Sequence, residues 1–520
     1  MAQAHTPPLS RLSTAERNWQ RGANHRVMLR PKKTGGGGRP GGGGSGSGSW
    51  ADPVVQSGAP AQGYTVGAVF EGQGTGGAIP PDPNLAVGIY TDTVNNTQTT
   101  QIMQVVNTSV DVYGTDGTPL MPSSVDLGAL FSYLTNTNCS AYPDGGDVIV
   151  LWDQLDQRWL LSQLAYNSTF TQNDLCLAIS QTSDATGIYY LYDIPFGGSL
   201  PDYPKLAVWR DGIYFSANMF NTTINRRTGT ATSTFIGAQA CSFPRAYVSS
   251  PPDIVTMTCS GSGNTAIYNI LPASLDGTNL PPSGPDYYLQ FVDNLSTTSG
   301  NELALYQFQS GQLKLLGNLP AATFHEACGG ATCIPQAGTT QQLDSLGDRL
   351  MYRLSYRSYS DGTQAMVVNH SVQVNSSNNQ TGIRWYQLCS SGGSFSVCKQ
   401  STFSPDSTYR WMGSIAQDSV GDLGLGYSVS SSSLFPSIAV TGMQPADNGE
   451  MEQENVVFPG PNFQDTYNRW GDYSSMVLDP NDCAFWYTTE YSTTTNVLGV
   501  WNFFWGTKIV SFSFNGCTPH

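Results

Sequence analysis

The feature of this sequence that most restricts its fold is a strand unit that recurs, with variation, along most of the chain. In each copy a turn rich in Pro, Gly or Asp leads into a short apolar strand, and polar turns lead into further strands. Such turns between β-rich runs are hairpin signals. The strand starts lie at residues 80–88, 146–153, 201–209, 285–293, 344–352, 410–416 and 469–479. Seven units of about four strands predict an all-β chain folded as a single seven-bladed β-propeller.

The composition favours strands and turns over helices. Charged residues make up only 12% of the 520 residues, against about 25% in an ordinary domain. Asp outnumbers Glu by 30 to 8, and Asp favours turns whereas Glu favours helices. This composition excludes coiled coils and helical repeats. A six- or eight-bladed propeller and tandem β-sandwiches stay open as alternatives, although no linker-like break interrupts residues 60–515.

The first 50 residues differ from the rest of the chain. They carry eight Arg or Lys and one Glu, and residues 35–49 read GGGGRPGGGGSGSGS, which is typical of a flexible linker. We therefore expect a disordered, basic, Gly-rich leader over residues 1–50 and a propeller domain over residues 51–520. A basic arm for nucleic acid is a less favoured interpretation. The remaining chain carries 15 basic and 37 acidic residues and would repel nucleic acid, and no stretch is apolar enough for a membrane span.

The cysteines predict disulfides rather than a metal site. There are ten, an even number, without any Cys-x-x-Cys, and no histidine completes a ligand pattern. Their spacing suggests five sequential pairs, although sequence alone cannot prove connectivity. The pairs are Cys139–Cys176, Cys241–Cys259, Cys328–Cys333, Cys389–Cys398 and Cys483–Cys517. Because disulfides form in oxidising compartments, we expect an extracellular or cell-surface protein, although no signal peptide is recognisable.

Nine Asn-x-Ser/Thr sequons agree weakly with that compartment. If they are glycosylated, they mark surface loops. They begin at Asn95, Asn107, Asn138, Asn167, Asn221, Asn294, Asn369, Asn375 and Asn379.

Several segments, taken together, resemble an uncharacterised family of large secreted β-propeller proteins of bacterial type. They are PDPNLAVG at 81–88, QVVN at 104–107, PDYPKL at 201–206, QQLDSL at 341–346, VVNHSV at 367–372 and RWGDYSSM at 469–476. The resemblance spans roughly residues 65–517 and does not include the leader. It implies a secreted propeller that is distantly similar to sialidases.

The similarity to sialidases can be tested on individual residues. A sialidase needs an arginine triad for the substrate carboxylate and a Tyr/Glu nucleophile pair. Arg353, Arg410 and Arg469 are candidates for the triad, and Glu490 lies in the Tyr-rich segment 487–491. The Phe/Tyr-Arg-Ile-Pro motif and the repeated Ser-x-Asp-x-Gly-x-Thr-Trp box of sialidases are absent, so sialidase activity is disfavoured.

Acidic residues recur at the strand starts, and a propeller would bring them to one mouth of its central channel. Two carboxylates about 5–10 Å apart could hydrolyse a glycoside. The same oxygens could bind Ca²⁺, for which we consider Asp82, Asp147 and Asp202. The alternative is that each Asp caps its own turn. The catalytic candidates are Asp82, Asp147, Asp202, Asp344, Asp472 and Glu490, and Asp286 lies at a further strand start.

Two Arg-Trp pairs lie at matching points of consecutive units. Arg410-Trp411 and Arg469-Trp470, together with Arg353, are candidates for ligand binding, because guanidinium and indole groups stack on sugars or clamp anions. Pairing of the arginines with Asp between blades is the alternative.

The sequence therefore favours a non-catalytic extracellular propeller that serves as a binding or structural module for glycans or protein partners. A glycoside hydrolase or lyase that uses the Asp residues at the propeller mouth is the first alternative. A building block of an extracellular assembly, with self-association, is the second. No cofactor is certain, and Ca²⁺ is the only one considered.

Overall fold

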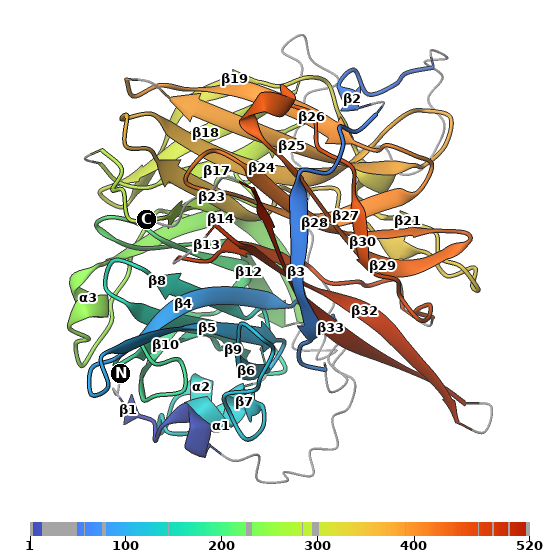
Figure 1. Cartoon of the computed structure of the whole chain (residues 1–520). Coiled ribbons are helices and arrows are strands. Elements are labelled where there is room, and N and C mark those ends of the chain that lie inside the picture. The colour runs from blue at the N-terminus through green and yellow to red at the C-terminus, as the bar shows by residue number, and fades with distance from the viewer. Residues whose placement is uncertain are drawn as a thin grey trace.

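The computed structural model of the chain describes residues 4–12, 49–56, 58–74, 80–143, 145–224, 231–282, 284–293, 301–390, 392–465, 467–480, 483–497 and 500–515. Within these residues nearly all regular structure is β-strand, arranged in sheets around a common centre (Figure 1). The expectation of an all-β propeller is confirmed.

The strands group into four-stranded antiparallel units that follow one another along the chain. The first unit holds β4 (Asn84–Asp92), β5 (Thr97–Val106), β6 (Ser109–Gly114) and β7 (Val125–Asp126). The second holds β8 (Ile149–Asp153), β9 (Arg158–Tyr166), β10 (Asn173–Ser180) and β11 (Tyr189–Gly197). The third holds β12 (Ser199–Val208), β13 (Gly212–Ile224), β14 (Ala231–Pro244) and β15 (Thr258–Cys259). The fourth holds β16 (Leu271–Asp276), β17 (Tyr287–Val292), β18 (Glu302–Gln309) and β19 (Gln312–Pro320).

The C-terminal half continues the same pattern. The next unit holds β23 (Met351–Ser358), β24 (Gln364–Gln373), β25 (Thr381–Ser390) and β26 (Phe395–Phe403). It is followed by β27 (Tyr409–Gln417), β28 (Leu423–Ser431), β29 (Leu434–Met443) and β30 (Asn455–Phe458). The last unit holds β31 (Ser475–Leu478), β32 (Phe485–Val497), β33 (Val500–Phe514) and β3 (Tyr64–Glu71).

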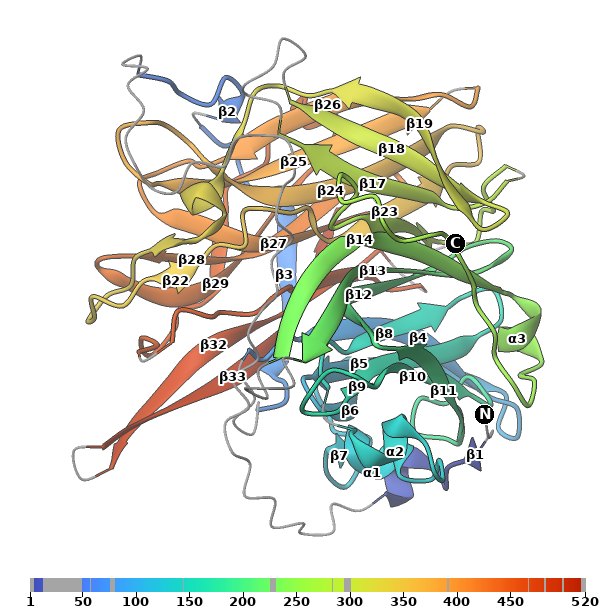
Figure 2. The same cartoon turned by 180° about the vertical axis from the view of Figure 1, so that it is seen from behind.

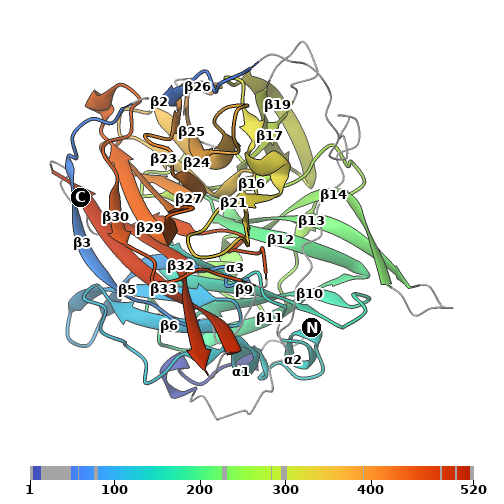
Figure 3. The same ribbon diagram turned by 90° about the vertical axis from the view of Figure 1, so that its right-hand side faces the viewer.

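The ring is closed by strands from opposite ends of the chain. β3 pairs antiparallel with β33, and Figures 1 and 3 show the two strands side by side. The first strand of each unit contacts the first strand of the next in a closed cycle, β4–β8–β12–β16–β23–β27–β31 and back to β4. Because a closed cycle leaves no unpaired unit at either end, this arrangement needs no separate capping element.

We interpret each four-stranded unit as one blade. Two blades are not separate sheets, because β16 and β23 pair in parallel and merge them into one ten-stranded sheet. The start of the fourth blade was predicted at the wrong place. Residues 285–293 form β17, the second strand, whereas the first strand β16 follows Asn269 and lacks the Pro/Asp signal of the other starts.

Part of the predicted leader is ordered and packed against the propeller. β1 (Ala4–His5) pairs with β11, and the 3-10 helix η1 (Leu9–Arg11) buries the Leu9 side chain in the core below the first two blades. The expectation of disorder is therefore wrong for residues 4–12, where an apolar side chain stabilises the contact. Residues 13–48, including most of the Gly-rich run, lie outside the described residues.

A second attachment follows the Gly-rich run. β2 (Val55–Gln56) adds in parallel to β26, and the buried Asp52 accepts hydrogen bonds from Arg384 and Thr402. Both side chains of the Asp52–Arg384 ion pair are almost completely buried. Residues 52–56, which follow the predicted boundary at residue 51, are thus fixed to the blade that contains β26.

The remaining elements are short and lie between strands (Figure 2). They are α1 (Leu127–Phe131), α2 (Asn138–Ala141), α3 (Ala246–Ser249), η2 (Ala327–Gly330), η3 (Pro445–Asp447), β20 (His325–Glu326), β21 (Thr332–Ile334) and β22 (Leu343–Asp344). Among the described helices, none has the length and apolar character needed to cross a membrane.

Four disulfides join the predicted partners Cys139–Cys176, Cys241–Cys259, Cys328–Cys333 and Cys389–Cys398. The fifth predicted pair includes Cys517, which lies outside the described residues.

The sequons differ in their exposure. Those at Asn95, Asn221 and Asn379 are exposed, those at Asn138, Asn167 and Asn375 are partly exposed, and Asn294 lies outside the described residues. The prediction of a surface loop is wrong for Asn107 and Asn369. Asn107 is buried where two blades meet and donates both amide hydrogens, to Pro80 O and Asp82 Oδ2, while Asn369 lies within the central part of β24. A glycan on either amide is incompatible with the folded chain.

Candidate functional site

Three of the predicted acids meet where the inner strands begin. Single carboxylate oxygens of Asp82, Asp147 and Asp472 all lie within 4.8 Å of one another, and all three residues are buried. Asp82 and Asp147 adopt positive φ angles of 46° and 53°, which turn the chain into β4 and β8. We call these three residues the axial acid cluster.

The axial acid cluster binds the backbone of neighbouring blades. Asp82 Oδ1 accepts from Asp472 N at 2.6 Å, and Asp147 Oδ2 accepts from Tyr203 N at 3.1 Å. Asn107 joins the first two blades, because its Nδ2 donates to Asp82 and its Oδ1 accepts from Asp147 N. We considered that each Asp caps the backbone of its own turn. Instead, the carboxylates of Asp82 and Asp147 accept hydrogen bonds from the backbone of other blades.

Positive charges are already present beside the cluster. Arg469 forms an ion pair with Asp472. The buried Lys205 interacts electrostatically with all three acids. Burial lowers the pKa of Lys205 to about 7, against the opposing effect of the acids. Burial, together with repulsion from Asp472 and Asp147, raises the pKa of Asp82 well above its ordinary value. The raised pKa of Asp82 and the neighbouring cationic arginine both disfavour the concentrated negative charge that would attract Ca²⁺.

The Lys205 ammonium sits among tyrosine rings. Its Nζ lies 3.5 Å from the ring centroid of Tyr203 and 4.2 Å from that of Tyr473, and it donates to Pro204 O. Tyr473 in turn contacts Tyr352, with ring centroids 6.1 Å apart. Tyr352 also lines the cavity at the other ends of the inner strands.

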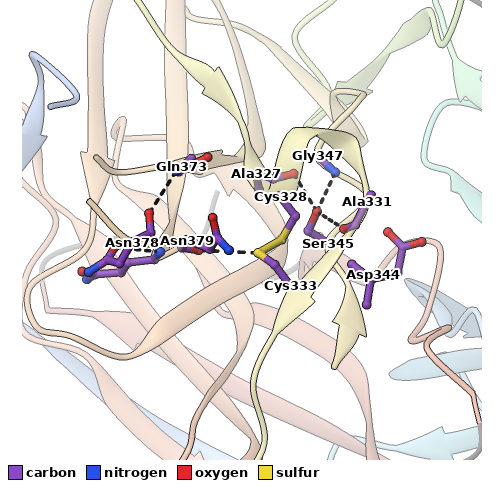
Figure 4. Close-up of a disulfide and its surroundings, with 12 residues drawn as sticks. Ala327, Cys328, Ala331, Cys333, Asp344, Ser345, Gly347, Gln373, Asn378 and Asn379 are labelled. Carbon is purple, nitrogen blue, oxygen red and sulfur yellow. Dashed lines mark hydrogen bonds between the residues drawn. A yellow bond between two sulfur atoms is a disulfide. The ribbon is translucent and has the colours of Figure 1, made fainter. Parts of the chain in front are cut away.

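A short disulfide-bonded segment packs beside the starts of β27 and β31. In it, the Ser345 hydroxyl contacts Ala327 O and Ala331 O, both at 2.9 Å, next to the Cys328–Cys333 disulfide (Figure 4). Ile334, Leu343 and Leu346 of this segment pack with Trp411, Met412 and Trp470 in one buried cluster. Apolar burial therefore fixes the segment on this side of the ring.

Further along the same inner strands lies a cavity of about 350 Å³, a size found in small-molecule sites. β4, β8, β16, β23 and β31, or the turns at their ends, contribute to its wall. The polar and aromatic lining includes Trp152, Gln154, Asp276, Tyr352, Arg353, Arg357, Tyr359 and Asp479. We call this space the axial cavity.

An ion pair and a small turn organise one side of the axial cavity. Arg353 pairs with Asp276, whose other oxygen accepts from Ser355 Oγ at 2.5 Å. Gln154 Nε2 donates to Leu275 O and Gly277 O, which fixes the turn after β16. Residues with carboxylate, guanidinium and aromatic groups thus line one cavity, the combination that carbohydrate sites use for hydroxyl groups and ring faces.

Several predicted ligand-binding residues are structural. Arg410 is fully buried and donates to Glu454, and Trp411 and Trp470 are fully buried against each other at 5.9 Å between ring centroids. Arg469 pairs with Asp472. The prediction of ligand contact is wrong for Arg410, Trp411 and Trp470, because neither their rings nor the guanidinium can reach a ligand. Of the three arginines, only Arg353 lines the axial cavity.

The remaining acidic candidates lie apart from the three that converge. Asp202 lies at an irregularity in the β12–β13 pairing and is not one of the three clustered acids, so a Ca²⁺ site made of Asp82, Asp147 and Asp202 is not assembled. Asp344 belongs to β22, where its carboxylate accepts from Leu346 N. Glu490 is buried and accepts from Gly471 N at 2.7 Å. Asp286 precedes the second strand of its blade and is not one of the three clustered acids.

Sequence reasoning missed Asp276, Arg357 and Asp479. Asp276 and Asp479 each follow an apolar strand and precede a Gly or Pro, a signal that the strand-start pattern does not include. Only the closed ring brings the ends of β16, β23 and β31 together.

The chain was compared with known proteins. No protein-family model and no curated protein matches it. Solved structures with a similar course include an α-L-arabinofuranosidase of Fusarium graminearum with arabinobiose (9% identity, 88% of this chain and 97% of that one, TM-score 0.35). A second is an α-L-arabinanase of Penicillium chrysogenum (11% identity, 75% of this chain and 98% of that one, TM-score 0.31). A third is an exo-β-1,3-galactanase of Phanerochaete chrysosporium (9% identity, 90% of this chain and 97% of that one, TM-score 0.28). At these identities and TM-scores, the matches assign no activity to this chain.

The fold and the disulfides define the class, a disulfide-bonded β-propeller with an axial cavity. No closer family is established for this chain.

Proposed function

We propose that this propeller acts on carbohydrates, binding a sugar residue in the axial cavity and hydrolysing its glycosidic bond. The observation that carries the proposal is the convergence of two carboxylates, Asp276 and Asp479, with aromatic and guanidinium groups on one cavity of about 350 Å³. Most glycoside hydrolases use two carboxylates, one on either side of the bond that is cleaved.

The surroundings of the two acids suggest different roles. Arg353 and the Ser355 hydroxyl both contact the carboxylate of Asp276 and hold its orientation, which a base or nucleophile needs. Asp479 comes from the end of β31 and is 2% exposed. It would donate a proton to the leaving oxygen, while Asp276 directs water to the anomeric carbon or attacks it first. The products are the sugar with a new hydroxyl at that carbon and the free alcohol.

The test is turnover on a panel of oligosaccharides, measured by the release of reducing ends. Asp276→Asn and Asp479→Asn should each lower the rate by about 100-fold or more, the usual contribution of a positioned acid or base. Asp361→Asn is the matched control, because Asp361 lies in an exposed turn outside the cavity. Cleavage that survives in both cavity variants would sink the assignment of these residues.

Binding without turnover is the second candidate function. The specific observation in its favour is that both Asp276 oxygens are engaged, one with Arg353 and one with Ser355. Binding of a panel member at the axial cavity with no reducing ends released would identify a binding module. A panel without any binding or cleavage would refute both functions.

We also place the protein outside the cytosol. The four disulfides support an oxidising compartment, where such bonds persist. Localisation of the full-length protein by fractionation, with thiol labelling of each fraction, tests this proposal. A chain found reduced in the cytosol would contradict it.

A further inference from the structure

The axial cavity leaves one kind of hydrogen-bonding group without a partner. Within the described residues, the buried polar side-chain atoms of its lining that lack a partner are all N–H donors. They include Trp152 Nε1, Arg353 Nε and Arg357 Nη2. Their residues are only 9%, 5% and 5% exposed, respectively. A buried donor without an acceptor costs about 1–3 kcal/mol, so these groups favour a ligand that supplies acceptors.

Asp276, one of the two acids that line the cavity, already has both of its carboxylate oxygens engaged, one with Arg353 and the other with Ser355. Arg357 donates its Nε to Gln417 O at 3.2 Å and forms no ion pair with any carboxylate among the described residues. Its positive charge is therefore not paired directly within the cavity.

The two guanidinium groups lie close together on the turn after β16. Arg353 contacts Asp276, and Arg357 Nη1 packs against the next residue, Gly277. A Cβ on Gly277 would approach Arg357 Nη1 to 2.5 Å, and the φ of Gly277 is +73°. Glycine at this position leaves room for the guanidinium, and Gln154 holds the turn through two backbone carbonyls.

We propose that the axial cavity recognises a carboxylate on its sugar, so that the ligand class is a uronic acid residue and not a neutral sugar. This inference rests on the proposed function, since it names the substrate class of that same cavity. A carboxylate offers only acceptors and matches the guanidinium fork, whereas each sugar hydroxyl also brings a donor. Arg357 supplies the charge, and Arg353 and Trp152 supply further donors.

The experiment is titration calorimetry on the full chain with matched probes. For each of glucose, galactose and mannose, the methyl glycoside, the corresponding uronate and the methyl ester of that uronate are compared. At least one uronate should bind about tenfold or more tightly than its ester and its neutral sugar, because a charge-assisted pair is lost in both.

Variants locate the effect. Arg357→Met should abolish the preference for the uronate, and Arg357→Lys should restore part of it, because lysine keeps the charge but lacks the fork. Trp152→Phe keeps an aromatic ring but removes the indole N–H together with the pyrrole part of the ring, and should weaken uronate binding severalfold. Arg158→Met is the control, since Arg158 donates to the backbone carbonyls of its own turn outside the cavity. Unfolding curves confirm that each variant folds.

The outcomes separate this inference from the proposed function. Equal binding of uronate and neutral sugar, or a uronate preference that survives Arg357→Met, overturns the inference while the function stands. A uronate preference that Arg357→Met removes, in a protein that cleaves no glycan, supports the inference and refutes hydrolysis. If none of the probes binds, the inference is wrong, and turnover on the oligosaccharide panel then decides the function separately.

Discussion

Glu490 provides the sharpest test of how burial acts in this propeller. It was a catalytic candidate, yet the structure places it in the interior of the last blade, 1% exposed. Its Oε1 accepts from Gly471 N at 2.7 Å and its Oε2 accepts from Thr489 Oγ1 at 3.1 Å. Burial raises the pKa of Glu490 from 4.5 to about 7. We predict that Glu490→Gln stabilises the protein above pH 7 and leaves its stability almost unchanged near pH 4.5.

The direction and size of this change in the free energy of unfolding follow from proton linkage. The folded state holds the Glu490 proton more tightly than the unfolded state, so its contribution to stability is fully present below pH 4.5 and is lost as the pH rises through about 7. A shift of this size corresponds to a loss of about 3 kcal/mol between those pH values, at about 1.4 kcal/mol for each pKa unit. Glutamine cannot ionise, and its carbonyl can still accept from Gly471 N.

The assay is urea unfolding of the wild type and Glu490→Gln at pH 4.5, 6 and 8, with the disulfides intact. The difference in free energy of unfolding should grow from near zero to about 3 kcal/mol in favour of the variant. Glu450→Gln is the matched control, because Glu450 is exposed, and its difference should stay flat. Parallel pH profiles for wild type and Glu490→Gln, or a variant less stable at pH 8, would refute the reasoning.

Three further outcomes are expected. Arg384→Met should destabilise the fold by about 3–5 kcal/mol in urea unfolding, because it leaves the buried Asp52 without its ion-pair partner. Adding Asp52→Asn should recover part of this stability. If the double variant recovers none of it, a direct Asp52–Arg384 interaction is contradicted. Trp411→Ala should lower the free energy of unfolding by about 3–5 kcal/mol because it creates a cavity in the core. Sugar binding measured by calorimetry should not weaken. A loss of binding without a loss of stability would show that Trp411 contributes to the site. Gly88→Ala should weaken sugar binding, because its Cβ would come within 2.5 Å of the Trp152 ring that lines the axial cavity; unchanged affinity would argue against that role for Trp152.

Much of the architecture could be predicted from local signals. Turn residues before apolar strands located the first strand of every blade except the fourth, and sequential spacing gave the four described disulfide pairs. The prediction for the fourth blade was wrong because its first strand, β16, follows Asn269 instead of a Pro/Asp turn. The second strand, β17, follows such a turn. Leu9 was missed because one apolar residue in a basic leader shows no periodicity.

The site was predicted only in part. From the recurrence of Asp at strand starts we predicted that these acids converge, because a closed ring brings equivalent positions to one axis. Asp82, Asp147 and Asp472 do converge. Their hydrogen bonds to other blades could not be predicted, because those partners are distant in sequence. The two Arg-Trp pairs gave no sign that their side chains point into the interior.

The sequence by itself indicated the strand content, the repeating unit, the recurrence of Asp at strand starts and the cysteine spacing, because each depends on residues near one another along the chain. Only the tertiary structure decided that β3 closes the ring on β33, that Trp411 and Trp470 are core residues, and that Asp276, Arg357 and Asp479 face one cavity. These facts depend on which ends of which strands meet around the axis. Ring closure sets that register through contacts between residues up to several hundred positions apart, and no local pattern records them.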